Sequence, residues 1–413
     1  MRNKALIAVV IALSFLLCSC SKGSLSSSTD SQDYVSSEIA VSAFPNDSKY
    51  NGSAENSFSN SALLESRSFT TSKKDTNALR LEGGKFTVAG VTVTKKGGTT
   101  ENASLSRLFG LNSALFIRAG AKVTIKDSEI LSKVPASASI FAYSDKTAAE
   151  LDSVLISSSG KRAAAVIAAG GASIKATNSS VRSVGENSVA IFSGDGGKIE
   201  LNKVSASTEG LDGPVILCEG ELIATDCDFT ATKSYPVEIK SGGNAVLKNC
   251  EISGTRNNFQ DITDTDLYTV SLAGDDNPAK LTLENCSFSN AKRDIFKLSG
   301  KTELTLNNCK IEVVRGDIFR ILKDSDAVIN FEQVNFSGIL PNISGAKAEL
   351  RFKDGSSFYG EIITTKENPA YSVTLEKGCK LSLSGDTYLA AFSGDLNDVE
   401  ISGNLYVAGE KVK

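Results

Sequence analysis

The chain of 413 residues contains no histidine and no tryptophan, one methionine and seven prolines. Histidine is the commonest general base and metal ligand in proteins, so its absence removes many hydrolytic and metal-dependent mechanisms. Without histidine or a C-x-x-C pair, neither a zinc site nor a cofactor is expected. The formal net charge of −4 is small for this length, which gives no electrostatic reason to expect nucleic-acid binding.

The first residues have the pattern of a signal peptide: basic residues at positions 2 and 4, then an apolar run over 5–17. This run is too short to span a bilayer. It ends in LCSC (17–20), which resembles the lipobox of exported bacterial lipoproteins. The resemblance implies a signal peptide over 1–19 and lipidation at Cys20, which would anchor the protein to a membrane of the cell envelope. A plain signal peptide with incidental cysteines is the alternative.

Residues 20–75 are rich in serine and show no sustained hydrophobic period. Such a composition buries too little apolar surface to offset the entropy of ordering the chain. We expect a flexible tether here, of which the short apolar patches at 62–64 and 68–70 could fold onto the domain that follows.

From residue 76 to 413 the sequence repeats itself, most clearly in AVLKNCEIS (245–253), LTLENCSFS (281–289) and LTLNNCKIE (304–312). Most copies are 22 to 26 residues apart, with longer steps after 91 and after 250 that indicate insertions. This period predicts a solenoid. The positions equivalent to the cysteine of each copy are Val91, Ser128, Val154, Ser179, Val204, Cys227, Cys250, Cys286, Cys309, Val334, Ser356, Cys379 and Leu405.

Each copy divides into three short strands separated by turn residues. In PVEIKSGGNAVLKNCEIS (236–253), strands at 237–239, 245–247 and 250–252 are separated by a glycine pair and by Asn249. Leucine-rich repeats have this length too, but their L-x-x-L-x-L frame is missing. The sequence therefore predicts an all-β parallel solenoid of about thirteen coils.

The residue before the cysteine position is repeatedly Asn or Asp, which tolerate the left-handed backbone of a tight corner. A column of such side chains resembles the asparagine ladder of right-handed parallel β-helices of the pectate-lyase-like type. NALRLEGG (77–84) and KDGSSFYGEI (353–362) extend the resemblance toward an adhesin-like group of bacterial cell-surface proteins. The resemblance implies a right-handed parallel β-helix over 76–413. The expected ladder residues are Asp127, Asn178, Asp226, Asn249, Asn285 and Asn308.

The cysteines at the repeat position are expected to point inward and stack as small buried side chains. The distance between adjacent coils is compatible with a disulfide, although in-register side chains seldom reach the required torsion. Cys218, in contrast, is predicted to point outward and to be a reactive thiol. The stacked set is Cys227, Cys250, Cys286 and Cys309.

Enzymes occur on this fold, so catalytic motifs need a direct test. Polygalacturonase-like sites require a Gly-His-Gly motif that this chain cannot have. Asp261, Asp264 and Asp266 lie close together in the second insertion and form a weak Ca²⁺ candidate, for which a solvated loop is the simpler interpretation. A basic residue near Glu238, as in some polysaccharide lyases, is not singled out by any motif. We expect no catalytic residues.

The outward side of the first strand in each coil carries apolar residues where alternation would place polar ones. Five such residues would form an exposed stripe about 20 Å long. Either the insertion over 97–107 or the tether covers this stripe, or it binds a glycan, a protein partner or a second copy. The predicted stripe is Phe116, Phe141, Ile167, Ile191 and Ile216, followed by polar Glu238, Ser271, Lys297 and Arg320.

Three functions remain open from the sequence. The first is a lipid-anchored adhesin-like protein of the cell envelope that binds a glycan or a neighbouring protein. The second, supported by fold analogy alone, is a polysaccharide lyase or a related carbohydrate-active enzyme. The third is a structural envelope protein that associates with itself through the stripe.

Overall fold

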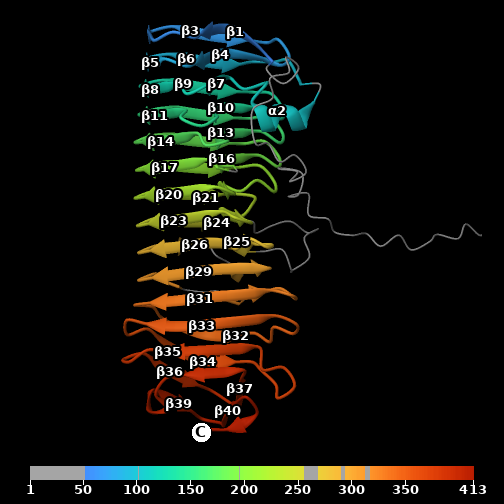
Figure 1. The fold of residues 1–413 in the computed structure, drawn as a ribbon, viewed down its shortest axis with the longest axis vertical. Helices are drawn as coiled ribbons and strands as arrows, with labels where there is room; N and C mark the ends of the chain where they lie inside the picture. Colours follow the sequence, from blue (N-terminus) through green and yellow to red (C-terminus); the bar gives the residue numbers. More distant parts are fainter. Residues whose placement is uncertain (1–51, 101, 195, 255–267, 290–293, 312–316) are drawn as a thin grey trace, which may run out of the picture.

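The computed structural model describes residues 52–100, 102–194, 196–254, 268–289, 294–311 and 317–413. They form a rod of parallel strands stacked coil upon coil (Figure 1). About 12 turns lie between residues 53 and 383. The predicted all-β solenoid is confirmed, although the last predicted copy, at Leu405, falls in a separate three-stranded sheet. In the described part of the chain, no helix is long and apolar enough to span a membrane.

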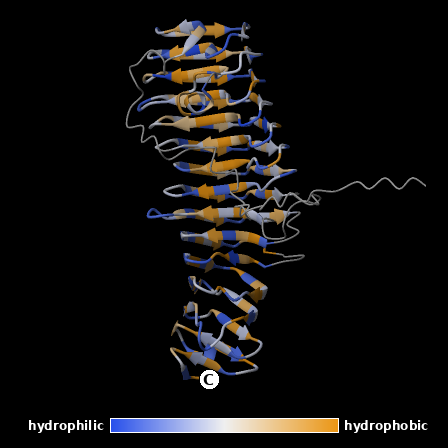
Figure 2. Ribbon diagram, turned by 90° about the vertical axis from the view of Figure 1, so that its right-hand side faces the viewer, coloured by the Kyte–Doolittle hydropathy of each residue, from blue (hydrophilic) through white to orange (hydrophobic). Residues whose placement is uncertain are grey.

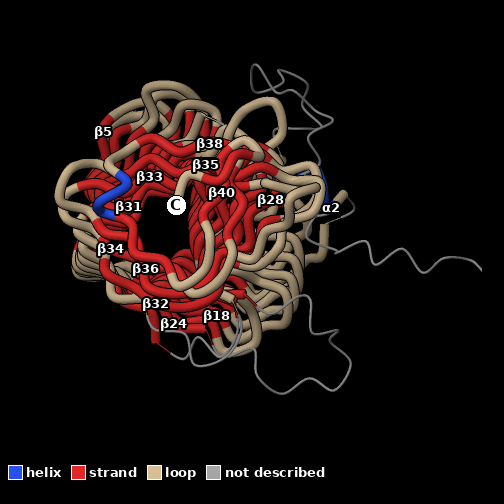
Figure 3. Tube along the Cα trace, turned by 90° about the horizontal axis from the view of Figure 1, so that it is seen from below, coloured by secondary structure: helices blue, strands red, loops and turns tan. Residues whose placement is uncertain are grey.

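Three long parallel sheets form the walls of the rod, and α2 (Ala103–Phe109) lies outside them (Figure 3). Sheet A has 11 strands: β1 (Ser53–Phe58), β4 (Thr76–Glu82), β7 (Leu115–Arg118), β10 (Ala138–Tyr143), β13 (Ala164–Ala169), β16 (Val189–Ser193), β19 (Ile216–Cys218), β22 (Val237–Lys240), β25 (Tyr268–Ala273), β28 (Asp294–Ser299) and β30 (Phe319–Ile321). Sheet B has 14: β2 (Ala62–Glu65), β5 (Lys85–Ala89), β8 (Lys122–Lys126), β11 (Ala148–Asp152), β14 (Ser173–Thr177), β17 (Lys198–Asn202), β20 (Glu221–Thr225), β23 (Asn244–Lys248), β26 (Ala279–Glu284), β29 (Lys301–Asn307), β31 (Asp326–Glu332), β33 (Lys347–Lys353), β35 (Tyr371–Leu375) and β38 (Ala391–Ser393).

Sheet C supplies the third wall of the N-terminal coils, and a four-stranded sheet D takes its place near the C-terminus. Sheet C has nine strands: β3 (Ser68–Thr71), β6 (Thr92–Lys95), β9 (Glu129–Ser132), β12 (Leu155–Ser158), β15 (Ser180–Ser183), β18 (Ser205–Thr208), β21 (Asp228–Ala231), β24 (Glu251–Gly254) and β27 (Ser287–Ser289). Sheet D contains β32 (Asn335–Leu340), β34 (Ser357–Ile362), β36 (Lys380–Leu383) and β39 (Val399–Ile401). The last sheet contains β37 (Thr387–Leu389), β40 (Leu405–Val407) and β41 (Glu410–Lys411), and η3 (Leu396–Asp398) precedes β39.

The solenoid begins earlier than the sequence predicted. Strands β1, β2 and β3 pair in parallel with β4, β5 and β6, so they form a complete first coil. The predicted boundary at residue 76 is therefore wrong, because 53–71 belong to the solenoid. Composition misled here, since this coil has polar outward residues and buries few large side chains of its own. The remainder of the predicted tether, up to residue 51, lies outside the described residues.

The core is a set of columns in which each coil places an aliphatic side chain on that of its neighbour. Leu247 of β23 is in register with Leu283, and Leu283 is in register with Leu306. All three are fully buried, and each such column removes apolar surface from water along the rod. Figure 2 shows the resulting hydrophobic strands, which dominate the upper coils and become mixed with polar residues toward the C-terminus.

In the coils from β8 to β29, the corner that follows the sheet B strand has the left-handed backbone. Its residues have φ between 47° and 58°, and they include Ser153 and Lys203 as well as the predicted Asn and Asp. Stacking on the coils above and below holds these two residues in a conformation that they rarely adopt. The complete set over these coils is Asp127, Ser153, Asn178, Lys203, Asp226, Asn249, Asn285 and Asn308.

Candidate functional site

From Phe116 to Arg320, the outward side of sheet A is a single in-register row of side chains that changes character halfway along. Its N-terminal part is apolar and its C-terminal part is polar and charged. We call the first the apolar row, namely Phe116, Phe141, Ile167, Phe192 and Leu217. We call the second the polar row, namely Glu238, Ser271, Lys297 and Arg320.

The predicted stripe was wrong at two of its five positions. Ile191 pairs with Val166 and Ile216, and these residues belong to the main core inside the solenoid. The outward neighbours are Phe192 and Leu217 instead. Because VAIF and VILC are unbroken apolar runs, they carry no alternation that distinguishes inside from outside. A slip of one residue therefore went undetected, and it moves each side chain to the opposite face.

The prediction that this stripe faces solvent was also wrong. Phe116, Phe141 and Ile167 are at most 2% exposed, as are Ile191 and Ile216 inside the core. The apolar row packs in a second hydrophobic cluster, separate from the main core, together with Tyr143. The first insertion contributes to this cover, since the rings of Phe109 in α2 and Tyr143 are 6.5 Å apart. Of the two interpretations from the sequence, self-coverage is the one observed.

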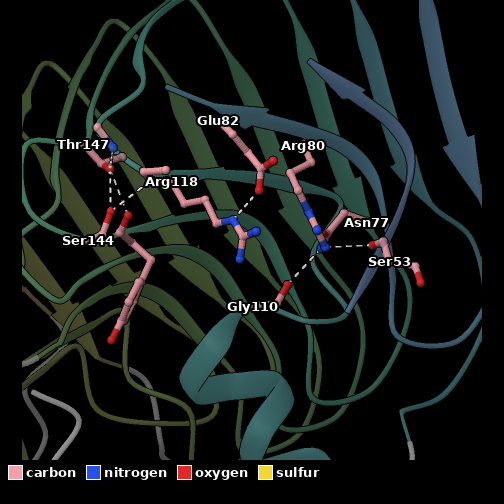
Figure 4. A network of polar contacts seen from close by, with 11 residues as sticks. Ser53, Asn77, Arg80, Glu82, Gly110, Arg118, Ser144 and Thr147 are labelled. Carbon is pink, nitrogen blue, oxygen red and sulfur yellow. Dashed lines mark hydrogen bonds and ion pairs between the residues drawn. The ribbon is translucent and has the colours of Figure 1, made fainter. Parts of the chain in front are cut away.

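A polar network fixes the insertion against the N-terminal coils (Figure 4). Asn77 Nδ2 donates to the carbonyl of Gly110, at the C-terminal end of α2, over 2.9 Å. Arg80 donates to Asn77 Oδ1 and to the carbonyl of Ser53 in the first coil. The Arg80 guanidinium also lies 5.6 Å from the centre of the Phe116 ring. Burial and the nearby Arg118 lower the pKa of Arg80 to about 10, a value at which it stays charged at neutral pH.

Cys218 does not point outward, contrary to the prediction. It is fully buried in the main core, and its Sγ donates to the carbonyl of Gly220 over 3.3 Å. Burial raises the pKa of this thiol to about 12. Because the thiolate is the reactive form, Cys218 is an inert core residue rather than a reactive thiol.

The polar row is built around a buried carboxylic acid. Glu238 is 7% exposed, and its Oε2 accepts a hydrogen bond of 3.1 Å from the hydroxyl of Tyr235. Lys240 Nζ lies 3.9 Å from Glu238 Oε1. The rings of Tyr235 and Tyr268 have centroids 4.7 Å apart, and Lys297 Nζ lies 4.7 Å from the Tyr268 centroid. Two lysines and two tyrosines from neighbouring coils thus surround one acid.

Desolvation dominates the electrostatics of this cluster. Burial raises the pKa of Glu238, although Lys240, the bond from Tyr235 and Lys297 each act in the opposite direction. Burial, together with the charge of Glu238, raises the pKa of Tyr235 well above its ordinary value. Both shifts favour the protonated forms of this hydrogen-bonded carboxyl and phenol, next to the ammonium groups of two lysines. Sequence reasoning placed Glu238 and Lys297 on the outward face but missed Tyr235, which precedes β22, and Tyr268, which is the first residue of β25.

The C-terminal end of the polar row is an ion-paired group. Arg320 Nη1 lies 3.3 Å from Asp294 Oδ2, and the backbone N–H of Asp317 donates to Asp294 Oδ1 over 2.9 Å. Burial and the neighbouring Asp294 raise the pKa of Asp317.

The ladder residues lie at the corner between sheets B and C, and not on sheet A, which carries the row. Asn249 donates to Asp226 over 2.9 Å, Asn285 to Asn249 over 3.1 Å, and Asn308 to Asn285 over 2.7 Å. Asn178 donates a hydrogen bond to Asp152 instead. Asp127 has the same left-handed backbone conformation but takes no part in this series of side-chain hydrogen bonds. These contacts stabilise the corner.

The four stacked cysteines are buried beside this ladder as free thiols. Cys227 Sγ donates to the carbonyl of Thr225 and accepts a hydrogen bond from the N–H of Val204. In another coil, Ser179 Oγ accepts the equivalent bond from the N–H of Val154. A thiol at this position therefore substitutes for a serine that satisfies corner backbone groups. Cys250, Cys286 and Cys309 likewise donate to the carbonyls two residues before them.

Cys20 and the weak Ca²⁺ candidate Asp261, Asp264 and Asp266 lie outside the described residues. Among the residues that the structure describes, no group of three or more acidic or cysteine side chains is arranged to hold a metal ion.

The family model for a right-handed beta helix region matches this chain over residues 113–258 and 164–334. These overlapping matches together cover more than half of the sequence. A search of curated proteins finds no significant match. The stacked parallel sheets thus define a protein of the β-solenoid class, and the chain belongs to the right-handed β-helix family.

Proposed function

We propose that this chain is a lipid-anchored protein of the bacterial cell envelope that binds a glycan through the polar row. One observation carries the proposal: the outward face of sheet A changes from a covered apolar row to half-buried charged groups next to two tyrosines. The partly exposed Tyr268 ring and the ammonium groups of Lys240 and Lys297 are of the kinds that sugar recognition uses for stacking and for hydrogen bonds. The signal peptide and lipobox-like segment support the location.

A binding screen of the full chain against immobilised glycans and cell-surface proteins tests the binding part. Lys297→Ala should weaken glycan affinity at least tenfold, since a hydrogen bond from a charged group contributes about 1.5–3 kcal/mol. Lys280→Ala is the matched control, because Lys280 lies on the neighbouring sheet and pairs with Glu303 at 2.8 Å. Equal affinities for the two variants, or binding of proteins alone, would contradict the proposal.

The anchor is tested separately in cells grown with a labelled fatty acid. The wild-type chain should incorporate the label and fractionate with membranes, and Cys20→Ala should do neither. Label in Cys20→Ala would show that another residue is modified.

A carbohydrate-active enzyme is the second candidate, favoured by the hydrogen bond between Tyr235 and the buried acid Glu238. Such a pair next to Lys240 has the residue types of general acid–base chemistry. A panel of uronic-acid polysaccharides, incubated with and without Ca²⁺, would reveal turnover. Activity that Tyr235→Phe abolishes would favour the enzyme over the binding protein.

A further inference from the structure

Four consecutive coils carry a cysteine at the corner position that serine or valine occupies in most other coils. A serine satisfies the corner backbone as well as a cysteine does, since Ser179 accepts from Val154 as Cys227 accepts from Val204. The corner therefore does not require a thiol, and least of all four in succession. We call these residues the thiol column, namely Cys227, Cys250, Cys286 and Cys309.

The thiol column is in strict register along the rod. The residues two positions before each cysteine pair with their counterparts in the next coil, and so do the residues one position after it. The thiols of neighbouring coils hydrogen-bond to each other. All four side chains are at most 6% exposed, so the sulfurs form a buried line parallel to the rod axis.

The spacing of this line fits one kind of ligand better than a disulfide. Equivalent atoms of adjacent parallel strands are about 4.8 Å apart. A disulfide needs Cβ atoms about 3.5–4.5 Å apart and sulfurs that turn toward each other, which side chains pointing in one direction do not provide. Two metal–thiolate bonds of about 2.3 Å each span about 4.6 Å when the metal lies between the sulfurs. The interval between neighbouring coils therefore has the length that a linear, two-coordinate metal ion requires.

The backbone of the corner can support the thiolate form that metal binding needs. The N–H of Val204 donates to Cys227 Sγ over 3.5 Å. In the next three coils each sulfur likewise accepts a hydrogen bond from the backbone of the cysteine one coil before it. A hydrogen bond from an N–H group favours the charged form of the sulfur that accepts it. Every sulfur of the column thus has a donor that can stabilise it once its proton has left.

We propose that the thiol column binds Cu(I), with each ion held between the sulfurs of two neighbouring coils. Thiolates are the soft ligands that Cu(I) prefers. For each thiol used, an S–H bond breaks, a sulfur–copper bond forms and the proton leaves to solvent, while copper and sulfur keep their oxidation states. Four sulfurs enclose three intervals, so the column holds at most three ions, whose charge largely offsets that of four thiolates.

The same geometry argues against zinc. Zn²⁺ takes four ligands in a tetrahedron, and sulfurs in one line cannot surround a single ion. A site of two sulfurs also agrees with the finding that, in the described part of the chain, no three acidic or cysteine side chains are arranged around a metal position.

Anaerobic titration of the full chain with Cu(I), in competition with a chromogenic Cu(I) chelator, tests this inference. Because the sulfurs are buried, the protein is both incubated in its folded state and refolded from urea with the ion present. The wild type should retain two or three copper ions and release protons as it binds them. Its thermal unfolding midpoint should rise, since the ions bind the folded state. Zn²⁺ should bind at least tenfold more weakly.

Two double variants, each lacking two thiols, locate the site. Cys250→Ser with Cys286→Ser interrupts the column, and serine fits this position as it does at Ser179, so copper affinity should fall at least tenfold. Cys218→Ser with Cys379→Ser is the control and should bind as the wild type. Cys218 is in register with Ser193, and Val334 and Ser356 separate Cys379 from the column.

Several results would overturn the inference. One is no copper uptake by either route, and another is equal affinity of the two double variants. A lower unfolding midpoint with Cu(I) would show that the ion prefers the unfolded chain. A metal-free protein that lacks reactive thiols after unfolding would show that neighbouring cysteines form disulfides instead.

Discussion

The two halves of the sheet A outward face share one backbone and one register but have opposite relations to solvent. In the N-terminal half, Phe116 and Phe141 are buried in a second hydrophobic cluster, whose Tyr143 contacts Phe109 of α2. In the C-terminal half, Lys297 and Arg320 remain half-buried next to the buried acid Glu238. The backbone of the solenoid therefore does not decide which part of this face is exposed to solvent. The segments that pack over the face decide it.

The corner between sheets B and C shows a second difference between the halves. From Asp226 to Asn308 the side chains form an unbroken series of hydrogen bonds. In the N-terminal half, Ser153 and Lys203 interrupt the series, although their backbone has the same left-handed conformation. The C-terminal corner thus has a continuous side-chain ladder, whereas the N-terminal corner has separate bonds such as that from Asn178 to Asp152.

The largest expected effect comes from removing a ring of the apolar row. Phe141→Ala should lower the free energy of unfolding by about 3–5 kcal/mol, since a buried phenylalanine is replaced by a cavity. Urea unfolding followed by circular dichroism measures the change. Tyr359→Ala is the control: Tyr359 is 68% exposed on sheet D, and its loss should change stability by no more than about 0.5 kcal/mol. Similar effects of both would show that the apolar row is not a true second core.

In the polar row, Glu238→Gln should change how stability depends on pH. Since the pKa of Glu238 is raised in the folded protein, the folded state holds this proton more firmly than the unfolded chain. This contribution is fully present below the ordinary value of 4.5 and is lost as pH rises through the raised pKa. Wild-type stability should therefore fall with pH over this window relative to Glu238→Gln, whose curve is flatter. Parallel curves for the two proteins would contradict the raised pKa.

Breaking the C-terminal ladder should have a smaller effect. Asn249→Ala removes the hydrogen bonds to Asp226 and Asn285, and it replaces a residue that tolerates a φ of 54° with one that tolerates it less well. The free energy of unfolding should fall by about 1–2 kcal/mol. The exposed Asn244 in the same coil is the control, and Asn244→Ala should cost less than about 0.5 kcal/mol. The midpoints of thermal unfolding provide the comparison.

The smallest effect is a gain. Lys203→Asn places a residue that tolerates the left-handed backbone between Asn178 and Asp226, so it should stabilise the protein by about 0.5 kcal/mol. Asn202→Lys, one position earlier in ordinary strand geometry, should bring no such gain. A decrease in the unfolding midpoint of Lys203→Asn would show that the lysine has a role that the corner geometry does not explain.

Much of the fold could be predicted because consecutive coils repeat the same sequence pattern. The spacing of the NC pairs at 249, 285 and 308 located the left-handed corner, and alternation within AVLKN located the inward column. The first coil was missed because residues 53–71 are polar. Their structure depends on strand pairing with β4, β5 and β6, which composition does not reveal.

The candidate site was less predictable. Glu238 and Lys297 followed from the period of the repeat, but Tyr235 and Tyr268 lie outside it, and their meeting depends on how successive coils are joined. The pKa of Glu238 depends on burial, which no sequence pattern expresses.

By itself the sequence determined the solenoid, its period and the turn residues of its corner, since these depend on local backbone preference and on alternation within each coil. Only the tertiary structure decided which outward residues meet solvent. In VAIF and VILC every side chain is apolar, so register came from pairing with neighbouring strands. Exposure was decided by contacts from segments far away in the sequence, such as α2 over Phe141, because burial is a property of what packs on a side chain and not of the side chain itself.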